Sequence, residues 1–175
     1  MNIRKLRGLR YVRRFNFHQC VNYTTVAEHS FFVALIIMEL FPNDAGIVKN
    51  ALLHDAEEAC TGDIGYLTRK LLGKEAVDVV EHMARIELDV ETPHKPNSMV
   101  DLADAVELKI YLEEERKAGN NNLIQIEAET MGRINVLLRS WIGSVSRKVM
   151  DMIEIVRPAG DPEVMTHEGE QWKSQ

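Results

Sequence analysis

The apolar residues of this chain recur at spacings of three and four along most of its length, and this helical periodicity constrains the fold more than any other feature. The sequence has no run of alternating β-branched residues and no Asn-Gly or Asp-Gly hairpin turn. Its 175 residues are the length of one domain. We therefore predict an all-α fold, a compact single-domain helical bundle over residues 1–157. Residues 158–175 are expected to form a C-terminal tail that is flexible or docked on a neighbouring subunit.

Capping and helix-breaking residues predict where the helices begin and end. Thr25 and Glu28 have the spacing of a capping box, which predicts a helix from Val26 that stops before Pro42. This helix is apolar almost all round, so we expect it to be buried at the centre of the bundle. The other helices are predicted at 3–11, from Asn43 or Asp44 to Gly62, at 68–90 with a break at Gly73, at 98–117, and at 123–156 with a kink at Gly143.

The composition indicates a reduced, cytoplasmic protein. Its two cysteines, Cys20 and Cys60, are too few for a disulfide framework. No apolar run reaches the roughly 20 residues that span a bilayer, so we expect no membrane segment. The N-terminal residues are too basic, and too poor in continuous apolar sequence, for a secretory signal.

Charge is distributed unevenly between the N-terminal segment and the rest of the chain. Residues 1–20 hold six basic residues and no acidic one; since the net charge is −6, the remainder carries −12. This basic arm suggests an anionic ligand near the N-terminus. The alternative is a solvated basic helix that pairs with the acidic body, and charge alone favours that alternative.

A mixed set of imidazoles and carboxylates indicates a metal site. His54 and Asp55 are adjacent within ALLHDAEEACTGD, His29 lies 25 residues upstream, and Asp104 follows about fifty residues downstream. Two histidines with two carboxylates suit a catalytic divalent metal with open coordination positions. All four fall in segments predicted as helix, so three helices are expected to present them inward, as helix bundles do.

Two further carboxylates are candidates for acid–base chemistry. Glu58 lies four residues after His54, on the same face of the predicted helix, where it can orient or deprotonate water. Asp63 follows Gly62 in a predicted loop and can serve the leaving group or hold an arginine.

Each of these residues also has an ordinary structural interpretation. A single histidine such as His29 on an apolar helix is more often a core residue than a ligand. Asp104 taken alone is more often a capping or polar-face residue, and Asp101 competes with it on the same face. The conjunction of residues therefore carries the prediction. The sequence contains no HExxH, HxxEH, P-loop, GxSxG or GxGxxG motif.

Four segments of the chain resemble the HD-domain phosphohydrolases, above all the small 5'-deoxynucleotidase branch and the related phage dATP triphosphohydrolases. They are Arg14-Phe15, VAEHS at 26–30, HDAEEACTGD at 54–63 and LADAVELKIYLEEERKAGN at 102–120. The resemblance covers most of residues 1–120 and implies an all-helical fold. It also implies metal ligands at His29, His54, Asp55 and Asp104, a catalytic Glu58, a functional Asp63, and contact between Arg14 and the phosphate or nucleotide.

The chain departs from that family at two places. Phe15 stands where the family often has tryptophan, so stacking on a base is retained but the indole N–H is lost. The Pro-Thr-Pro-Val-Lys stretch often found after TGD-Leu is replaced by residues 65–70. Either Arg69 or Lys70 could supply the positive charge that the lysine of that stretch provides in the family. Tyr66 could contact the base or sugar.

Members of the family act on nucleoside phosphates with Co, Mn, Mg, Zn or a similar divalent metal ion, and commonly form homo-oligomers. The resemblance therefore implies a metal-dependent phosphohydrolase of 2'-deoxynucleotides, a small-molecule substrate. We favour a dNTP triphosphohydrolase that releases deoxynucleoside and triphosphate, because the basic arm suits a polyphosphate. The alternative is a 5'-deoxynucleotidase that hydrolyses dNMPs. A non-catalytic nucleotide- or nucleic-acid-binding module is an alternative of another class, although the acidic body argues against a broad nucleic-acid surface.

Overall fold

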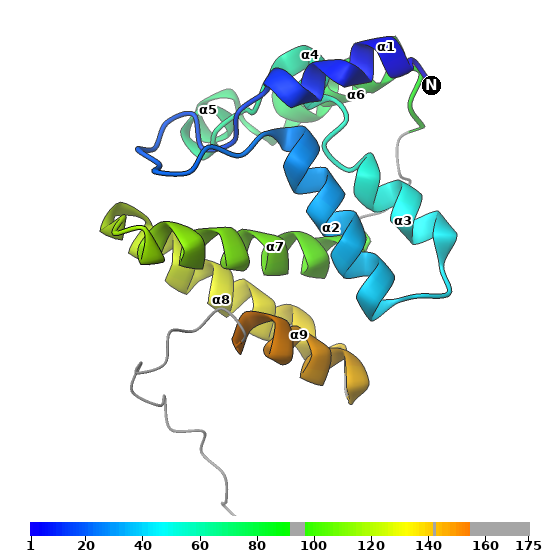
Figure 1. Ribbon diagram of the computed structural model, residues 1–175. Helices are drawn as coiled ribbons and strands as arrows, with labels where there is room; N and C mark the ends of the chain where they lie inside the picture. Colours follow the sequence, from blue (N-terminus) through cyan, green and yellow to red (C-terminus); the bar gives the residue numbers. More distant parts are fainter. Residues whose placement is uncertain (92–96, 142, 155–175) are drawn as a thin grey trace, which may run out of the picture.

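The computed structural model describes residues 1–91, 97–141 and 143–154, and these residues form an all-α fold (Figure 1). The helices are α1 (Ile3–Leu6), η1 (Arg7–Tyr11, 3-10), α2 (Val26–Leu40), α3 (Ala45–Leu52), α4 (Glu58–Thr61), α5 (Tyr66–Leu72), α6 (Lys74–Glu87), α7 (Ser98–Lys117), η2 (Asn121–Leu123, 3-10), α8 (Ile124–Leu138) and α9 (Ser144–Glu154). Within these ranges, β-type backbone pairing is limited to one isolated antiparallel bridge, between Arg13 and Thr25. The predicted fold class is confirmed. The predicted tail at 158–175 lies outside the described residues.

Helices α2 and α7 cross at the centre and organise the other helices (Figure 1). Helix α3 packs against α2, whereas α8 and α9 lie along the opposite side of α7. The short helices α1, α4 and α5 gather with α6 above this layer. The main core takes fully buried side chains from five helices: Ile37, Ala51, Val106, Ile134 and Ile153. The chain thus brings residues far apart in sequence to the α2–α7 crossing. No helix in the described ranges combines the length and apolar character needed to cross a bilayer.

The predicted capping box starts α2. The Thr25 hydroxyl accepts a hydrogen bond from the Glu28 amide at 3.2 Å, and the Glu28 carboxylate accepts one from the Thr25 amide at 2.8 Å. These bonds satisfy N–H groups that would otherwise lack partners in the first turn.

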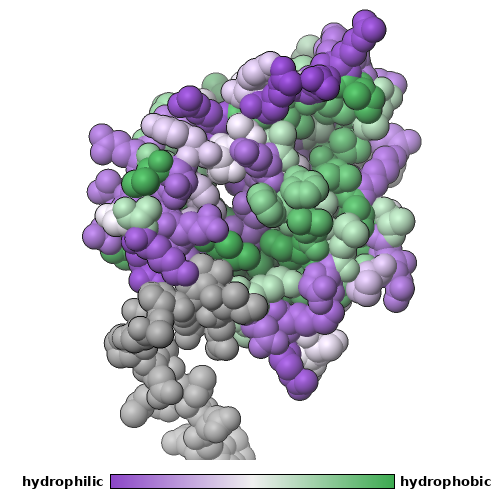
Figure 2. Space-filling model, viewed as in Figure 1, coloured by the Kyte–Doolittle hydropathy of each residue, from purple (hydrophilic) through white to green (hydrophobic). Residues whose placement is uncertain are grey.

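Helix α2 lies at the centre of the bundle, as predicted, but it is not buried on every side as its apolar sequence suggests. Its inner face packs on α3 and α7, but the opposite face is about half exposed and carries Phe31, Phe32, Leu35 and Met38. Hydrophobic side chains accordingly gather on the outward face of the molecule over this helix (Figure 2). An apolar helix face of this kind is typical of an interaction surface.

The single helix predicted from Asp44 to Gly62 is also interrupted. Asp44 caps α3 as expected, through a 3.0 Å bond from the Ile47 amide, but α3 ends at Leu52. Residues 53–57 form tight turns in which amides bond to carbonyls three residues earlier, for example Glu58 N to Asp55 O at 3.1 Å. His54 and Asp55 therefore lie in a turn and not in a helix.

The remaining helix breaks follow the sequence closely. Gly73 and Gly143 both adopt positive φ, 80° and 94°. Gly73 lies at the predicted break, but the kink predicted at Gly143 is a full interruption, since α8 ends at Leu138 and α9 begins at Ser144. Helix α7 spans the predicted residues 98–117, and Asn97 caps it: the Asn97 side chain accepts a 2.9 Å hydrogen bond from the Met99 amide. The predicted first helix is part α-helix and part 3-10 helix.

Candidate metal centre

Four polar side chains converge where α2, the 53–57 turn and α7 meet. The Nε2 atom of His29 lies 3.1 Å from His54 Nε2, 3.2 Å from Asp104 Oδ1 and 3.7 Å from Asp55 Oδ2. His54 Nε2 and Asp55 Oδ2 are 3.2 Å apart. Two ligands bound to one ion at about 2.1 Å lie roughly 3.0 to 3.4 Å apart, so these spacings fit a shared divalent cation. His29, His54 and Asp55 form a cluster that could hold such an ion.

Hydrogen bonds on the far side of each imidazole orient the two Nε2 atoms. His54 Nδ1 lies 2.7 Å from the Ala51 carbonyl oxygen, which can only accept, so Nδ1 carries the proton and Nε2 of the neutral ring offers a lone pair. His29 Nδ1 bonds to the Glu107 carboxylate. A carbonyl or carboxylate behind a ligating imidazole is the usual support of a metal-bound histidine. Two Nε2 atoms that face each other in this way need a proton or a cation between them.

The electrostatics of the cluster favour an added positive charge. Burial opposes the charged form of His54, but the carboxylates of Asp55 and Asp104 raise its pKa to about 9. Burial likewise works against ionised Asp104, yet His29 and Arg14 hold the pKa of that carboxyl below its usual value. Without metal, a proton on His54 balances the two carboxylates; a divalent cation can take the same place.

A buried arginine from α6 holds the turn that carries His54 and Asp55. Arg85 donates to the backbone carbonyls of Leu53 at 3.1 Å and His54 at 2.6 Å, and its guanidinium lies 2.6 Å from Glu57 Oε2. The Leu53 carbonyl also accepts from the Ala56 amide at 3.3 Å, whereas the donor to the His54 carbonyl, past the end of α3, is Arg85. Because residues 53–57 form turns, the consecutive side chains of His54 and Asp55 point toward the same place. In an α-helix, consecutive side chains are rotated by about 100° and point in different directions.

Glu58 begins α4 beside this turn and is buried. Burial, together with the negative charges of Asp55 and Asp63, raises the pKa of Glu58 to about 9. Because Asp55 contributes to that rise, a cation held by Asp55 would lower the pKa again. Glu58 is thus positioned to exchange a proton near the cluster.

Asp63 anchors the N-terminal segment to the site. Its Oδ2 accepts a 3.1 Å hydrogen bond from the Phe15 amide, and Phe15 adopts a left-handed φ of 57°. The Phe15 ring stacks on Tyr111 of α7, with centroids 5.3 Å apart at an interplanar angle of 16°. Arg14, the preceding residue, lies 3.4 Å from Glu107 Oε2 and 3.9 Å from Asp104 Oδ1. The structure therefore brings Arg14, Phe15 and Asp63 together with the metal candidates.

The other predicted substrate contacts lie in α5 with different partners. Arg69 donates to the Ile64 carbonyl at 2.9 Å and pairs with Glu81 of α6 at 2.6 Å. Tyr66 and Lys70 are on the same helix, and the Tyr66 side chain is largely exposed. The contacts of these described residues do not join them to the four converging side chains.

The basic arm is dispersed over the surface. The Arg13 guanidinium lies over the Tyr23 ring at 4.5 Å, Arg10 lies over Tyr11 at 4.4 Å, and Lys5 pairs with Glu87. Arg14 is the arm residue that pairs with Asp104.

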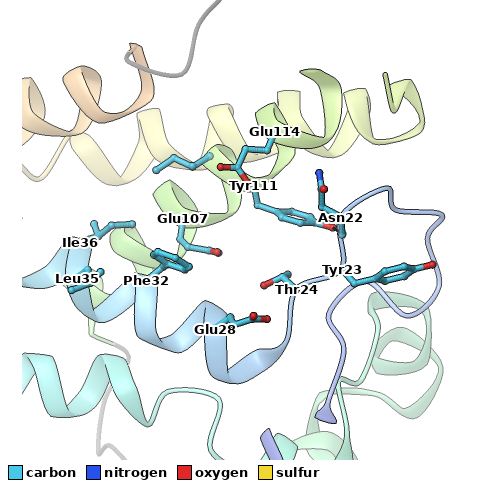
Figure 3. A pocket seen from close by; sticks show the side chains of 11 residues that line it. Asn22, Tyr23, Thr24, Glu28, Phe32, Leu35, Ile36, Glu107, Tyr111 and Glu114 are labelled. Atoms are coloured by element: carbon cyan, nitrogen blue, oxygen red, sulfur yellow. Dashed lines mark hydrogen bonds between the residues drawn. The ribbon is translucent and has the colours of Figure 1, made fainter. Parts of the chain in front are cut away.

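A cavity of about 320 Å³ adjoins the centre between α2, α7 and residues 22–24 (Figure 3). Its walls include Glu28 and Phe32 of α2 and Glu107, Tyr111 and Glu114 of α7. Figure 3 shows the Glu107 carboxylate between the two helices and the Tyr111 ring extending from α7 toward Asn22. The cavity meets the converging cluster at Glu107, because the same side chain bonds to His29.

Two residues of this centre were missed by the sequence predictions. Glu107 lies three residues after Asp104 on one face of α7, so helical spacing could have indicated it. Arg85 had no local signal, since its partners lie about 30 residues earlier in the chain.

The chain belongs to the HD domain family, whose pattern it matches over residues 6–138. This family lies within a superfamily of metal-dependent phosphohydrolases, in agreement with the His29–His54–Asp55 cluster. Among curated proteins, no match to the chain was found.

Proposed function

We propose that this protein is a divalent-metal-dependent phosphohydrolase of 2'-deoxynucleotides, and we favour a dNTP triphosphohydrolase that releases deoxynucleoside and triphosphate. The observation that carries the proposal is the convergence of His29, His54, Asp55 and Asp104, with neighbouring ligand atoms 3.1 to 3.7 Å apart. In this proposal those four side chains hold the metal. A divalent ion there supplies Lewis-acid activation of water and of a phosphate oxygen.

The remaining residues have separate roles. Glu58 accepts the proton of the attacking water, for which its position beside Asp55 is suited. Asp63 holds Phe15 and, with it, the segment that carries Arg14. Arg14 donates to phosphate oxygens and compensates charge that develops during transfer. Phe15 offers its ring to the base. Arg69, Lys70 and Tyr66 remain predicted contacts for a longer phosphate chain or the sugar, and reaching one would require Arg69 to leave Glu81.

The test is a panel of deoxynucleoside mono- and triphosphates incubated with Co²⁺, Mn²⁺ or Mg²⁺, with identification of the phosphate species released. Intact triphosphate from a dNTP supports the favoured activity. Orthophosphate from dNMPs alone would replace it with the 5'-deoxynucleotidase alternative. No release from any nucleotide, with chelator-insensitive binding of DNA or RNA, would contradict the catalytic proposal. Asp55→Ala is the matched inactive control.

We further propose that the protein is a homo-oligomer. The outward face of α2, with Phe31, Phe32, Leu35 and Met38, supports this because contiguous apolar surface of this kind favours association. Light scattering of the purified chain should give a mass above 20.0 kDa, and Phe31→Glu should lower it. A monomer at micromolar concentration would contradict the proposal.

A further inference from the structure

Two arginines from distant parts of the chain flank the carboxylate of Asp104. Arg133, on α8, donates to Asp104 Oδ2 at 2.9 Å. Arg14, which precedes α2, lies 3.9 Å from Oδ1, the oxygen that also faces His29 Nε2 at 3.2 Å. A metal on Oδ1 would therefore leave Oδ2 with Arg133. The two guanidinium groups are held on either side of one proposed metal ligand.

Arg133 has hydrogen-bonding capacity to spare. A guanidinium carries five N–H donors in a planar fork, and the bond to Asp104 uses one of its two Nη atoms. The Arg133 side chain is 45% exposed, whereas that of Arg14 is 18% exposed. An anion arriving from solvent can reach the remaining donors without displacing the bond to Asp104.

The charge around the centre makes such a cation necessary for an anionic substrate. Besides Glu58, whose raised pKa keeps it protonated in the metal-free protein, four acidic side chains surround it: Asp55, Asp63, Asp104 and Glu107. A phosphate group entering among carboxylates needs nearby positive charge beyond that of a metal. Arg69, a cation that the sequence suggested for this purpose, is already paired with Glu81.

We propose that Arg133 and Arg14 form a clamp that binds the phosphate groups of the substrate beside Asp104. The planar fork of arginine matches phosphate oxygens in a bidentate manner, and lysine does not reproduce this geometry. The identity of the phosphate compound as a deoxynucleotide rests on the proposed function above; the clamp itself requires only a phosphate anion. The competing role for Arg133 is to neutralise Asp104 and nothing more.

The first experiment measures binding of inorganic tripolyphosphate by calorimetry, with the free Mn²⁺ concentration held constant. Arg133→Gln should weaken binding about 10-fold to 100-fold, the effect of losing charge-assisted hydrogen bonds, and Arg133→Lys should fall between. The matched control is Arg139→Gln, an exposed arginine at the end of the same helix, and it should stay within about twofold of the wild type. Equal affinities for Arg133→Gln and Arg139→Gln would overturn the clamp.

A second experiment needs no variant and decides the matter even if Arg133→Gln does not fold. The wild-type protein with Mn²⁺ is labelled by phenylglyoxal, and modification of each arginine is followed by mass spectrometry. Tripolyphosphate should protect Arg133 at least about fivefold while labelling of Arg139 stays unchanged. If Arg133 only neutralises Asp104, tripolyphosphate will leave its labelling rate as it was, and the proposal fails.

These outcomes separate the clamp from the proposed function. Protection of Arg133 in a protein that hydrolyses no nucleotide would support the clamp and contradict the activity. Nucleotide hydrolysis with an unchanged KM in Arg133→Gln and no protection would support the activity and contradict the clamp.

Discussion

Arg85 donates a 2.6 Å hydrogen bond to the backbone carbonyl of His54, so a side chain of α6 fixes the main chain of a candidate metal ligand. The bond reaches the ligand's backbone and leaves its imidazole free to face His29. Rigid support of this kind holds ligand atoms at fixed spacing before an ion arrives. The α6 helix is thus part of the candidate centre although it contributes no ligand.

Arg85→Met should therefore destabilise the fold by about 2 to 4 kcal/mol, because it leaves the buried Glu57 carboxylate and the His54 carbonyl without their partner. It should also weaken Mn²⁺ binding, since the 53–57 turn loses its support. Urea unfolding and metal titration measure the two effects. Arg147→Met, at an exposed position on α9, should change stability by less than about 0.5 kcal/mol. If Arg85→Met bound Mn²⁺ with wild-type affinity, the 53–57 turn would keep its conformation without the hydrogen bonds from Arg85.

Metal should stabilise the protein only when the ligand set is complete. Mn²⁺ at 100 times its dissociation constant should add about 2.7 kcal/mol to the free energy of unfolding, and EDTA should remove it. Asp55→Ala should abolish this increment together with turnover. The control Asp78→Ala removes an exposed carboxylate of α6 and should keep both. A metal-induced rise in melting temperature that survives Asp55→Ala would remove Asp55 from the ligand set.

Glu58 should make the metal-free protein less stable as pH rises. Its pKa is about 9 in the folded protein and near 4.5 when unfolded, so its contribution to stability is complete below pH 4.5 and is lost as pH rises toward 9. Glu58→Gln lacks this loss. In EDTA, the stability of Glu58→Gln relative to wild type should increase from pH 5 to pH 9 by at least about 1.4 kcal/mol, the value of one pKa unit. Urea unfolding across that range measures it, and a constant difference would refute the buried, neutral Glu58.

Asp63 allows a test that separates position from charge. Asp63→Asn keeps an oxygen that can accept from the Phe15 amide, whereas Asp63→Ala leaves that amide without its partner and the 57° φ of Phe15 without support. The alanine variant should lose about 1 to 2 kcal/mol of stability and raise KM. The asparagine variant should keep KM near the wild-type value. A fall in the kcat of Asp63→Asn would then indicate a role for the negative charge of Asp63 in the reaction. Equal KM values in the alanine and asparagine variants would contradict the proposal that Asp63 anchors Phe15.

Local signals in the sequence were sufficient for most of the helices. The capping box of Thr25 and Glu28, Pro42, and the glycines at 73 and 143 act within a few residues of themselves, so their effects can be predicted without the fold. The interruption after Leu52 could not be predicted in this way, because it depends on donors from Arg85, far along the chain. The outward face of α2 was missed for a similar reason: an apolar sequence does not reveal how many neighbours a helix has.

The candidate centre was predictable as a set of residues but not as an arrangement. His29, His54, Asp55 and Asp104 were indicated by their chemistry and order, and the structure brings them together. The turn that carries His54 and Asp55, and the positions of Glu107 and Arg133, follow from how α2, α7 and α8 pack. That packing is nonlocal and leaves little trace in one sequence.

The chain order of the converging residues has a consequence for biosynthesis. His29 meets His54 across 25 residues, and meets Glu107 across 78. The first pair can approach as soon as α3 docks on α2, but the carboxylates of α7 leave the ribosome much later. Closing so long a loop is slow compared with forming either helix. A nascent chain therefore exposes His29, His54 and Asp55 before Asp104 and Glu107 have been synthesised, and ions bound then are held by fewer ligands than in the finished fold.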